Sequence, residues 1–192
     1  LKKYKSEINI FDMIKINDKI TLSEIKRKSY RNNWKVLWEN KVDYFENQIR
    51  NYAKEKKGIL NTFSYYIGMA ENAIEYVSKI EKSETMNNFD KIGFCHRRIF
   101  FPNYELNYLN PISFLLDLEV RDYAEYFKAG FFHGEDVERE FSNFLKIKKM
   151  GNYSYSMLFA RLMFPRMKTR FCWYPPVIDS MLQTSHQEKC EK

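Results

Sequence analysis

The densest group of chemically useful side chains lies between Cys95 and Asn103. His96 follows a short apolar run there, and Asn103 comes seven positions after His96 and five after Arg98. A histidine, a carboxylate two residues later and an asparagine five residues after that can support phosphoryl transfer, because the carboxylate accepts the proton of the attacking hydroxyl and the asparagine binds Mg²⁺. The spacing points to this chemistry, but an arginine stands at the position of the carboxylate.

A further candidate metal ligand, Asp117, ends the apolar run 114–117. The metal-binding aspartate of phosphotransferases of the protein-kinase type has this placement, on the far strand of a hairpin. Asn103 and Asp117 are therefore the candidate Mg²⁺ ligands, and His96 and Arg98 are the candidate catalytic-loop residues, with Arg98 at the position of the lost base. A guanidinium stays protonated at neutral pH, so we expect no general-base catalysis from this loop, whereas its planar fork of donors can still bind a phosphate.

Each candidate also has a structural interpretation. His96 lies between a strand and a loop, where it can donate a hydrogen bond to a backbone group or a carboxylate. Asn103 suits a turn, and Asp117 can cap the helix that follows it. We expect Arg121 and Asp122 to form an ion pair or a cap rather than to contact a ligand.

Long helices are expected before this segment. Apolar residues recur at intervals of three and four over 20–57 and 60–80, which predicts two helices that pack antiparallel through a short turn. The first would begin with the capping box Thr21–Glu24 and end at Gly58, after a run of lysines.

The remaining elements are a small hairpin and more helices. A polar loop at 82–90 precedes a short apolar run of strand length at 91–95. Two further runs at 99–101 and 112–116, separated by the turn-rich segment 102–111, predict a small hairpin. Helices are predicted at 120–129, closed by Gly130, at 135–149, and at 155–164, stopped by Pro165. The fold class is mainly α with a small β-hairpin, and the strand content should lie below the average of about 20–25%.

Composition excludes several classes of protein. A length of 192 residues with 44% hydrophobic content predicts a folded chain with one core. Three cysteines without CxxC spacing indicate neither a disulfide framework nor a zinc site. No apolar run is long enough to span a membrane and no signal-like segment is present, so we expect no membrane partner and an intracellular location.

The net charge of +7 is confined to one part of the chain. Residues 1–57 hold 15 basic and 8 acidic side chains, whereas residues 58–192 hold 17 of each. Such asymmetry marks either a nucleic-acid-binding face or a solvated helix face. No nucleic-acid-binding motif accompanies it, so we favour the solvated face and keep nucleic-acid binding through the basic first helix as an alternative.

Six patches of sequence resemble the spore-coat kinase-like proteins of endospore-forming bacteria, a family similar in fold to the aminoglycoside and choline phosphotransferases. The patches lie at 38–46, 66–73, 95–99, 110–117, 120–126 and 158–165, and the resemblance covers roughly residues 20–175.

The resemblance implies the helical C-terminal lobe of a protein-kinase-like (aminoglycoside phosphotransferase-like) fold. It implies a connecting segment from a missing N-terminal lobe at 1–20, the kinase-like lobe at 21–183 and a flexible tail at 184–192. The lobe that cradles the nucleotide, with its Gly-rich loop and lysine, is expected outside these residues, so we expect a fragment that binds ATP weakly. The wider superfamily has His-Gly-Asp where this chain has the tripeptide 96–98, His-Arg-Arg.

The leading hypothesis is thus a kinase-like protein with an eroded phosphotransferase site and a structural or binding role in spore coat assembly. By resemblance, its partners would be coat proteins and its location the mother-cell cytoplasm or the spore coat. The alternative is an active small-molecule phosphotransferase, for which the full-length protein would need ATP and Mg²⁺. No other cofactor is assigned.

Overall fold

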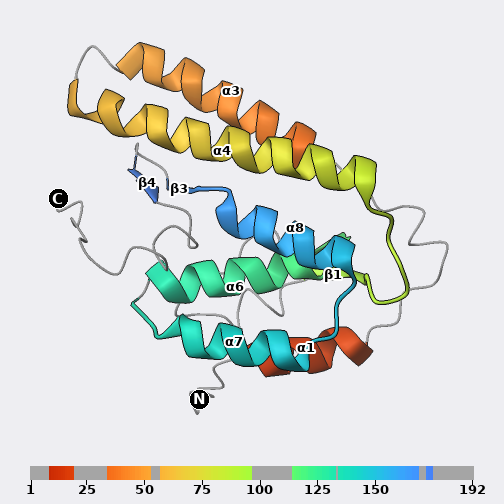
Figure 1. Ribbon diagram of the computed structural model, residues 1–192. Helices are drawn as coiled ribbons and strands as arrows, with labels where there is room; N and C mark the ends of the chain where they lie inside the picture. The colour runs from red at the N-terminus through yellow and green to blue at the C-terminus, as the bar shows by residue number, and fades with distance from the viewer. Residues whose placement is uncertain are drawn as a thin grey trace. The chain divides into compact units, whose positions relative to one another are not determined.

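The computed structural model describes residues 9–19, 34–52, 57–96, 114–132, 134–168 and 172–174, with the side chains of 50–62 and 166–174 left out. Its helices are α1 (Ile10–Lys19), α3 (Trp34–Tyr52), α4 (Lys57–Ser83), α6 (Val120–Phe132), α7 (Val137–Ile147) and α8 (Asn152–Met163) (Figure 1). Its strands are β1 (Ile92–His96), β2 (Phe114–Leu118), β3 (Arg166–Lys168) and β4 (Cys172–Tyr174). The expected mainly helical chain with a small antiparallel hairpin is confirmed.

Two short sheets are present in these ranges. Strands β1 and β2 pair antiparallel, with Gly93 opposite Asp117 and His96 opposite Phe114. The strand predicted at 112–116 therefore pairs with the run 91–95, whereas the sequence predicted the run 99–101 as its partner; that run lies outside the described residues. Strands β3 and β4 form a second antiparallel pair, which the sequence did not predict.

The chain divides into two compact units, one made of residues 1–32 and 85–158 and the other of residues 33–84 and 159–192. The second unit contains the helical hairpin of α3 and α4, which lie side by side as their periodicity predicts (Figure 1). Trp38 stacks on Phe164 at 4.3 Å between ring centroids, and the Arg161 guanidinium lies 4.6 Å from the ring of the buried Trp34. Aromatic burial thus supplies much of this unit's core.

Two glycines predicted to end helices do not end them. Helix α3 ends at Tyr52, and Gly58 lies in the first turn of α4, where the backbone amides have no partner within the helix in any case. Gly130 lies inside α6, and a β-carbon there would come within 2.8 Å of Val137 Cγ1. The absence of a side chain at Gly130 therefore allows α7 to pack closely against α6 at this point. The predicted capping box Thr21–Glu24 lies outside the described residues.

The first unit contains a helix that the sequence interpretation missed. No helix was predicted within residues 1–20, and α1 occupies 10–19 there and buries Ile10, Met13 and Ile14. Asn9 begins this helix because its side-chain oxygen accepts two first-turn amides at 3.0 Å. The sequence did contain a signal for this helix, namely the capping residue Asn9 followed by apolar residues at 10, 13 and 14.

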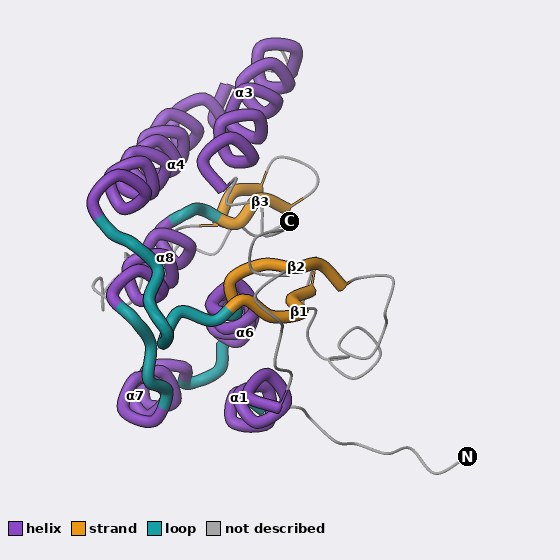
Figure 2. The backbone as a smooth tube through the Cα atoms, turned by 90° about the vertical axis from the view of Figure 1, so that its right-hand side faces the viewer, coloured by secondary structure: helices purple, strands orange, loops and turns teal. Residues whose placement is uncertain are grey.

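The hairpin of β1 and β2 lies beside α6, which also contacts α7 (Figure 2). The core here is aromatic: Phe127 meets Phe141 and Phe144 at 4.9 and 5.3 Å between centroids, and Tyr123 meets Phe144 at 5.1 Å. Helix α8 ends at Met163, one residue before the predicted end at 164 and two before Pro165, whose ring cannot continue a helix. None of the helices in the described ranges has the length and apolar character needed to cross a membrane.

Candidate functional site

The hairpin brings His96 and Asp117 into one buried region. His96 ends β1 and is 2% exposed, and Asp117 is the fourth residue of β2 and is 4% exposed. The two residues lie on paired strands, as the predicted site requires. The other candidates, Arg98 and Asn103, lie outside the described residues, so the catalytic loop and the Asn103–Asp117 metal pair stay predictions.

Asp122 holds both the ring and the backbone of His96. Its Oδ2 lies 2.5 Å from His96 Nδ1, and its Oδ1 accepts the His96 amide at 2.9 Å. Burial raises the pKa of the Asp122 carboxyl, and the hydrogen bonds and charge of His96 oppose that rise. The edge of the Phe114 ring packs against the imidazole at 4.9 Å between centroids. The expected structural hydrogen bond from His96 to a carboxylate is thus present.

Asp117 is tied to the helix that follows it. Its Oδ2 accepts a hydrogen bond from Arg121 Nη1 at 2.7 Å, and its Oδ1 accepts the Leu118 amide at 2.8 Å. Arg121 Nε also donates to the backbone oxygen of His96 at 3.2 Å. Burial lowers the pKa of Arg121, but the charge and hydrogen bond of Asp117 raise it by more, so the guanidinium stays cationic. Arg121 thus forms an ion pair, as expected, but its partner is Asp117, which the sequence analysis had not named.

These contacts form one connected polar group: Asp117, Arg121, His96 and Asp122. It fastens the end of β1 to the end of β2 and to the first turn of α6. Both oxygens of Asp117 already accept hydrogen bonds, one of them from the partly buried guanidinium of Arg121, so Mg²⁺ would have to compete with that cation for the carboxylate. Within the ranges that the structure covers, no group of three or more His, Cys, Asp or Glu side chains is arranged to hold a metal ion. In the described part of the predicted site Asp117 thus forms an ion pair with Arg121, and its role as a metal ligand with Asn103 stays a prediction.

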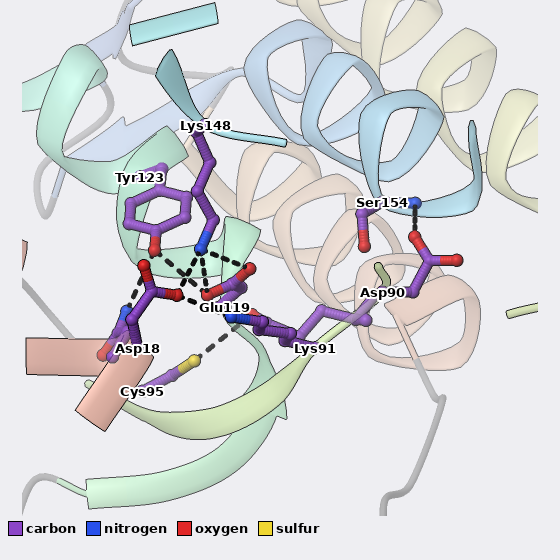
Figure 3. Close-up of polar contacts among 10 residues, drawn as sticks. Asp18, Asp90, Lys91, Cys95, Glu119, Tyr123, Lys148 and Ser154 are labelled. Carbon is purple, nitrogen blue, oxygen red and sulfur yellow. Dashed lines mark hydrogen bonds and ion pairs between the residues drawn. The ribbon is translucent and has the colours of Figure 1, made fainter. Parts of the chain in front are cut away.

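A second polar cluster lies in the same unit and was not singled out from the sequence. It joins Asp18, Lys91, Glu119, Tyr123 and Lys148 (Figure 3). Burial raises the pKa of Glu119, although Lys148 opposes this, whereas the pKa of Asp18 falls because the bonds from Lys91 and Lys148 outweigh its partial burial. The cluster contains two acidic side chains, Asp18 and Glu119, and two basic ones, Lys91 and Lys148, so its formal charges cancel. No local pattern could have revealed the cluster, because its members lie up to 130 positions apart.

An open cleft of about 370 Å³ lies on the α3–α4 hairpin, in the other unit. Four of the eight residues that line it are acidic and two are apolar; the lining consists of Lys35, Glu39, Val42, Asp43, Glu71, Ile74, Glu75 and Ser78. Two of these carboxylates have lysine partners, Glu39 with Lys35 at 3.8 Å and Glu75 with Lys79 at 2.7 Å. The two candidate site residues that the structure describes, His96 and Asp117, are not among the lining residues.

Comparison with known proteins identifies relatives of the chain. It is 26% identical over 179 residues to the endospore coat-associated protein YutH of Bacillus subtilis (strain 168). The aligned part covers 86% of this chain and 51% of that protein, so the chain spans about half the length of this curated relative. No solved structure matches the chain. The family model described as "Spore coat putative kinase YutH" matches residues 17–190, and the chain therefore belongs to that family.

Proposed function

We propose that this protein is a kinase-like component of the spore coat that binds other coat proteins and does not transfer phosphate. Its relative is described as endospore coat-associated, and its family model is described as "Spore coat putative kinase YutH". Location at the spore coat and coat proteins as partners are parts of this proposal. So is the fold, the helical lobe of an aminoglycoside phosphotransferase-like protein, which the order of helical hairpin, β-hairpin and further helices supports.

The pairing of Asp117 with Arg121 carries the proposal. A phosphotransferase of this type needs the aspartate of the far strand for Mg²⁺. Here that carboxylate accepts hydrogen bonds at 2.7 and 2.8 Å from a cation and an amide within its own chain. The sequence also has Arg98 where a general base would stand. The two features act together. Arg98 replaces the group that would accept the proton, and Arg121 binds the carboxylate that would bind Mg²⁺.

The test separates a structural role from a catalytic one with the variant Asp117→Asn. An asparagine keeps the shape of the side chain and can accept a hydrogen bond at its oxygen, but it loses the charge that favours Mg²⁺. We expect a deletion of the gene in its sporulating host to alter the coat, and we expect wild type and Asp117→Asn to restore the coat equally. Extraction of coat proteins from purified spores measures the restoration.

Turnover of ATP by the full-length gene product provides the opposite readout. We expect no Mg²⁺-dependent release of phosphate above the rate without protein, for wild type or variant. Turnover by the wild type that Asp117→Asn abolishes, in a variant that circular dichroism shows to be folded at the assay temperature, would establish the alternative, an active phosphotransferase.

A further inference from the structure

Lys148 is a buried cation that joins segments far apart in the sequence. Its side chain is 4% exposed, and its Nζ lies 3.0 Å from both carboxylate oxygens of Glu119 and 3.1 Å from Asp18 Oδ1. The ring centroid of Tyr123 lies 5.7 Å from the same nitrogen. Figure 3 shows the ammonium group between the two carboxylates. Lys148 follows the last residue of α7, so it connects that end of α7 to α1 and to the start of α6.

The contacts on the side of α1 hold its last turn. Asp18 accepts a second hydrogen bond, from Lys91 Nζ, at 2.6 Å. The neighbouring Asn17 donates to the Tyr123 hydroxyl at 3.3 Å, and that hydroxyl donates to Glu119 Oε2 at 3.1 Å. Because Asp18 and Lys91 are each about half-buried while Lys148 and Glu119 are almost fully buried, the Lys148–Glu119 pair is the desolvated centre of the cluster.

The contacts on the other side lead to the hairpin site. Glu119 is the one residue between β2 and α6, and its amide donates to the Lys91 carbonyl at 3.1 Å. Its own carbonyl accepts the amide of Asp122 at 3.2 Å. Asp122 in turn holds the ring and the amide of His96. This hydrogen bond ties the backbone of Asp122 to that of Glu119, so the position of Glu119 determines from where the Asp122 side chain reaches His96.

We propose that Lys148 is a positioning residue: it locks α1 to the junction between β2 and α6 and thereby sets the alignment of Asp122 with His96. A buried carboxylate that loses its cation must take up a proton, admit water or move. We expect each response to move Glu119 at the junction between β2 and α6. Because the Glu119 carbonyl accepts a hydrogen bond from the Asp122 amide, Asp122 should move with it. This role does not depend on ATP turnover and stands or falls separately from the proposed function.

Nuclear magnetic resonance of the full chain tests the role with Lys148→Met, which keeps the length of the side chain and removes its charge. We expect the His96 imidazole nitrogen and Nδ1 proton resonances to shift, and the amides of His96 and of α1 to exchange with solvent at least tenfold faster. Lys148→Arg should restore the His96 resonances in part because it restores the charge. Lys149→Met, at the exposed neighbouring position, should change none of these signals.

A lower melting temperature of Lys148→Met with unchanged His96 resonances and exchange would overturn the proposal, because Lys148 would then only stabilise the fold. Should Lys148→Met fail to fold, Glu119→Gln replaces it, since this variant removes the charge of the partner and nearly conserves its volume. Shifted His96 resonances in Glu119→Gln support the proposal, and wild-type resonances in that variant overturn it.

Discussion

Asp90 occupies the space that a side chain on Gly151 would need. The carboxylate is fully buried, its Oδ1 accepts the amide of Ser154 at 2.9 Å and its Oδ2 accepts the amide of Asn87 at 2.8 Å. A β-carbon on Gly151 would overlap both carboxylate oxygens. Asp90 thus satisfies a first-turn amide of α8 from a distant part of the chain and places negative charge at the positive end of that helix.

Gly151→Ala should lower the free energy of unfolding by about 1–3 kcal/mol, the usual cost of forcing extra volume into a packed site. Urea denaturation measures the change. Gly68→Ala is the matched control, because Gly68 lies inside α4 with no atom near its missing β-carbon. That control should gain roughly 0.5–1 kcal/mol from the better helix former. Equal stability of the two variants would contradict the close packing of Asp90 on Gly151.

Asp90→Ala should cost about 1–3 kcal/mol for each buried amide that it leaves without an acceptor. The same change should make room at position 151. In the background of Asp90→Ala, we therefore expect Gly151→Ala to cost much less than it does in the wild type. A double-mutant cycle built from the four unfolding free energies measures this coupling, and strict additivity would show that the two residues do not interact.

Arg121→Met should lower the free energy of unfolding by about 3–5 kcal/mol, because it leaves the buried carboxylate of Asp117 without its cation. The double variant with Asp117→Asn should recover part of that loss, since the uncompensated charge is then absent. Thermal unfolding followed by circular dichroism provides the comparison. A single variant as stable as the wild type would mean that this ion pair does not hold the hairpin to α6.

Arg98→Asp in the full-length protein should restore no ATP turnover, although a positioned general base alone contributes about 10²- to 10⁴-fold in rate. The reason is that Asp117 remains paired with Arg121. A single-turnover assay compares wild type, Arg98→Asp, and Arg98→Asp combined with Asp117→Asn. Turnover that appears in the single variant and disappears in the double variant would reveal a latent metal site.

Glu140→Gln should make stability depend less on pH. Burial raises the pKa of Glu140, the hydrogen bond from Tyr126 opposes the rise and the nearby Glu135 adds to it. A carboxyl with a raised pKa in the folded state contributes stability below its unfolded pKa near 4.5, and that contribution is lost as pH rises through the folded pKa.

Chemical denaturation from pH 4 to pH 7 should therefore show a smaller fall in unfolding free energy for Glu140→Gln than for the wild type. The exposed Glu138 on the same helix provides the control, and Glu138→Gln should retain the wild-type slope. A slope unchanged by Glu140→Gln would show that this carboxyl titrates alike in the folded and unfolded chains.

Features that depend on neighbouring residues could be predicted from the sequence. The stripe of Ile67, Ala70, Ala73 and Val77 predicted α4, and all four side chains are buried. The ion pair of Arg121 was also within reach, since its partner lies four positions earlier on the chain. In each case the signal and the contact lie within a few turns of backbone.

Features set by distant contacts could not be predicted in the same way. Helix α1 has only ten residues, and its burial depends on residues more than a hundred positions away. Strands β3 and β4 have three residues each, too few for a recognisable alternation. The pairing of His96 with Asp122 spans 26 positions, so it follows only once the hairpin has formed. Gly58 misled because glycine is common after a helix, yet the first turn of a helix tolerates it too.

The 130 positions between Asp18 and Lys148 also fix an order of events during synthesis. At roughly 5–20 residues per second, a ribosome needs about 7 to 26 s to add the segment that separates them. Helix α1 leaves the ribosome before Glu119, Tyr123 and Lys148 have been synthesised. Its apolar side chains, which are buried in the folded protein, therefore stay exposed during that time. Helix α1 is therefore made long before the residues that Asn17 and Asp18 contact, and until they exist it is a natural binding target for a chaperone on the nascent chain.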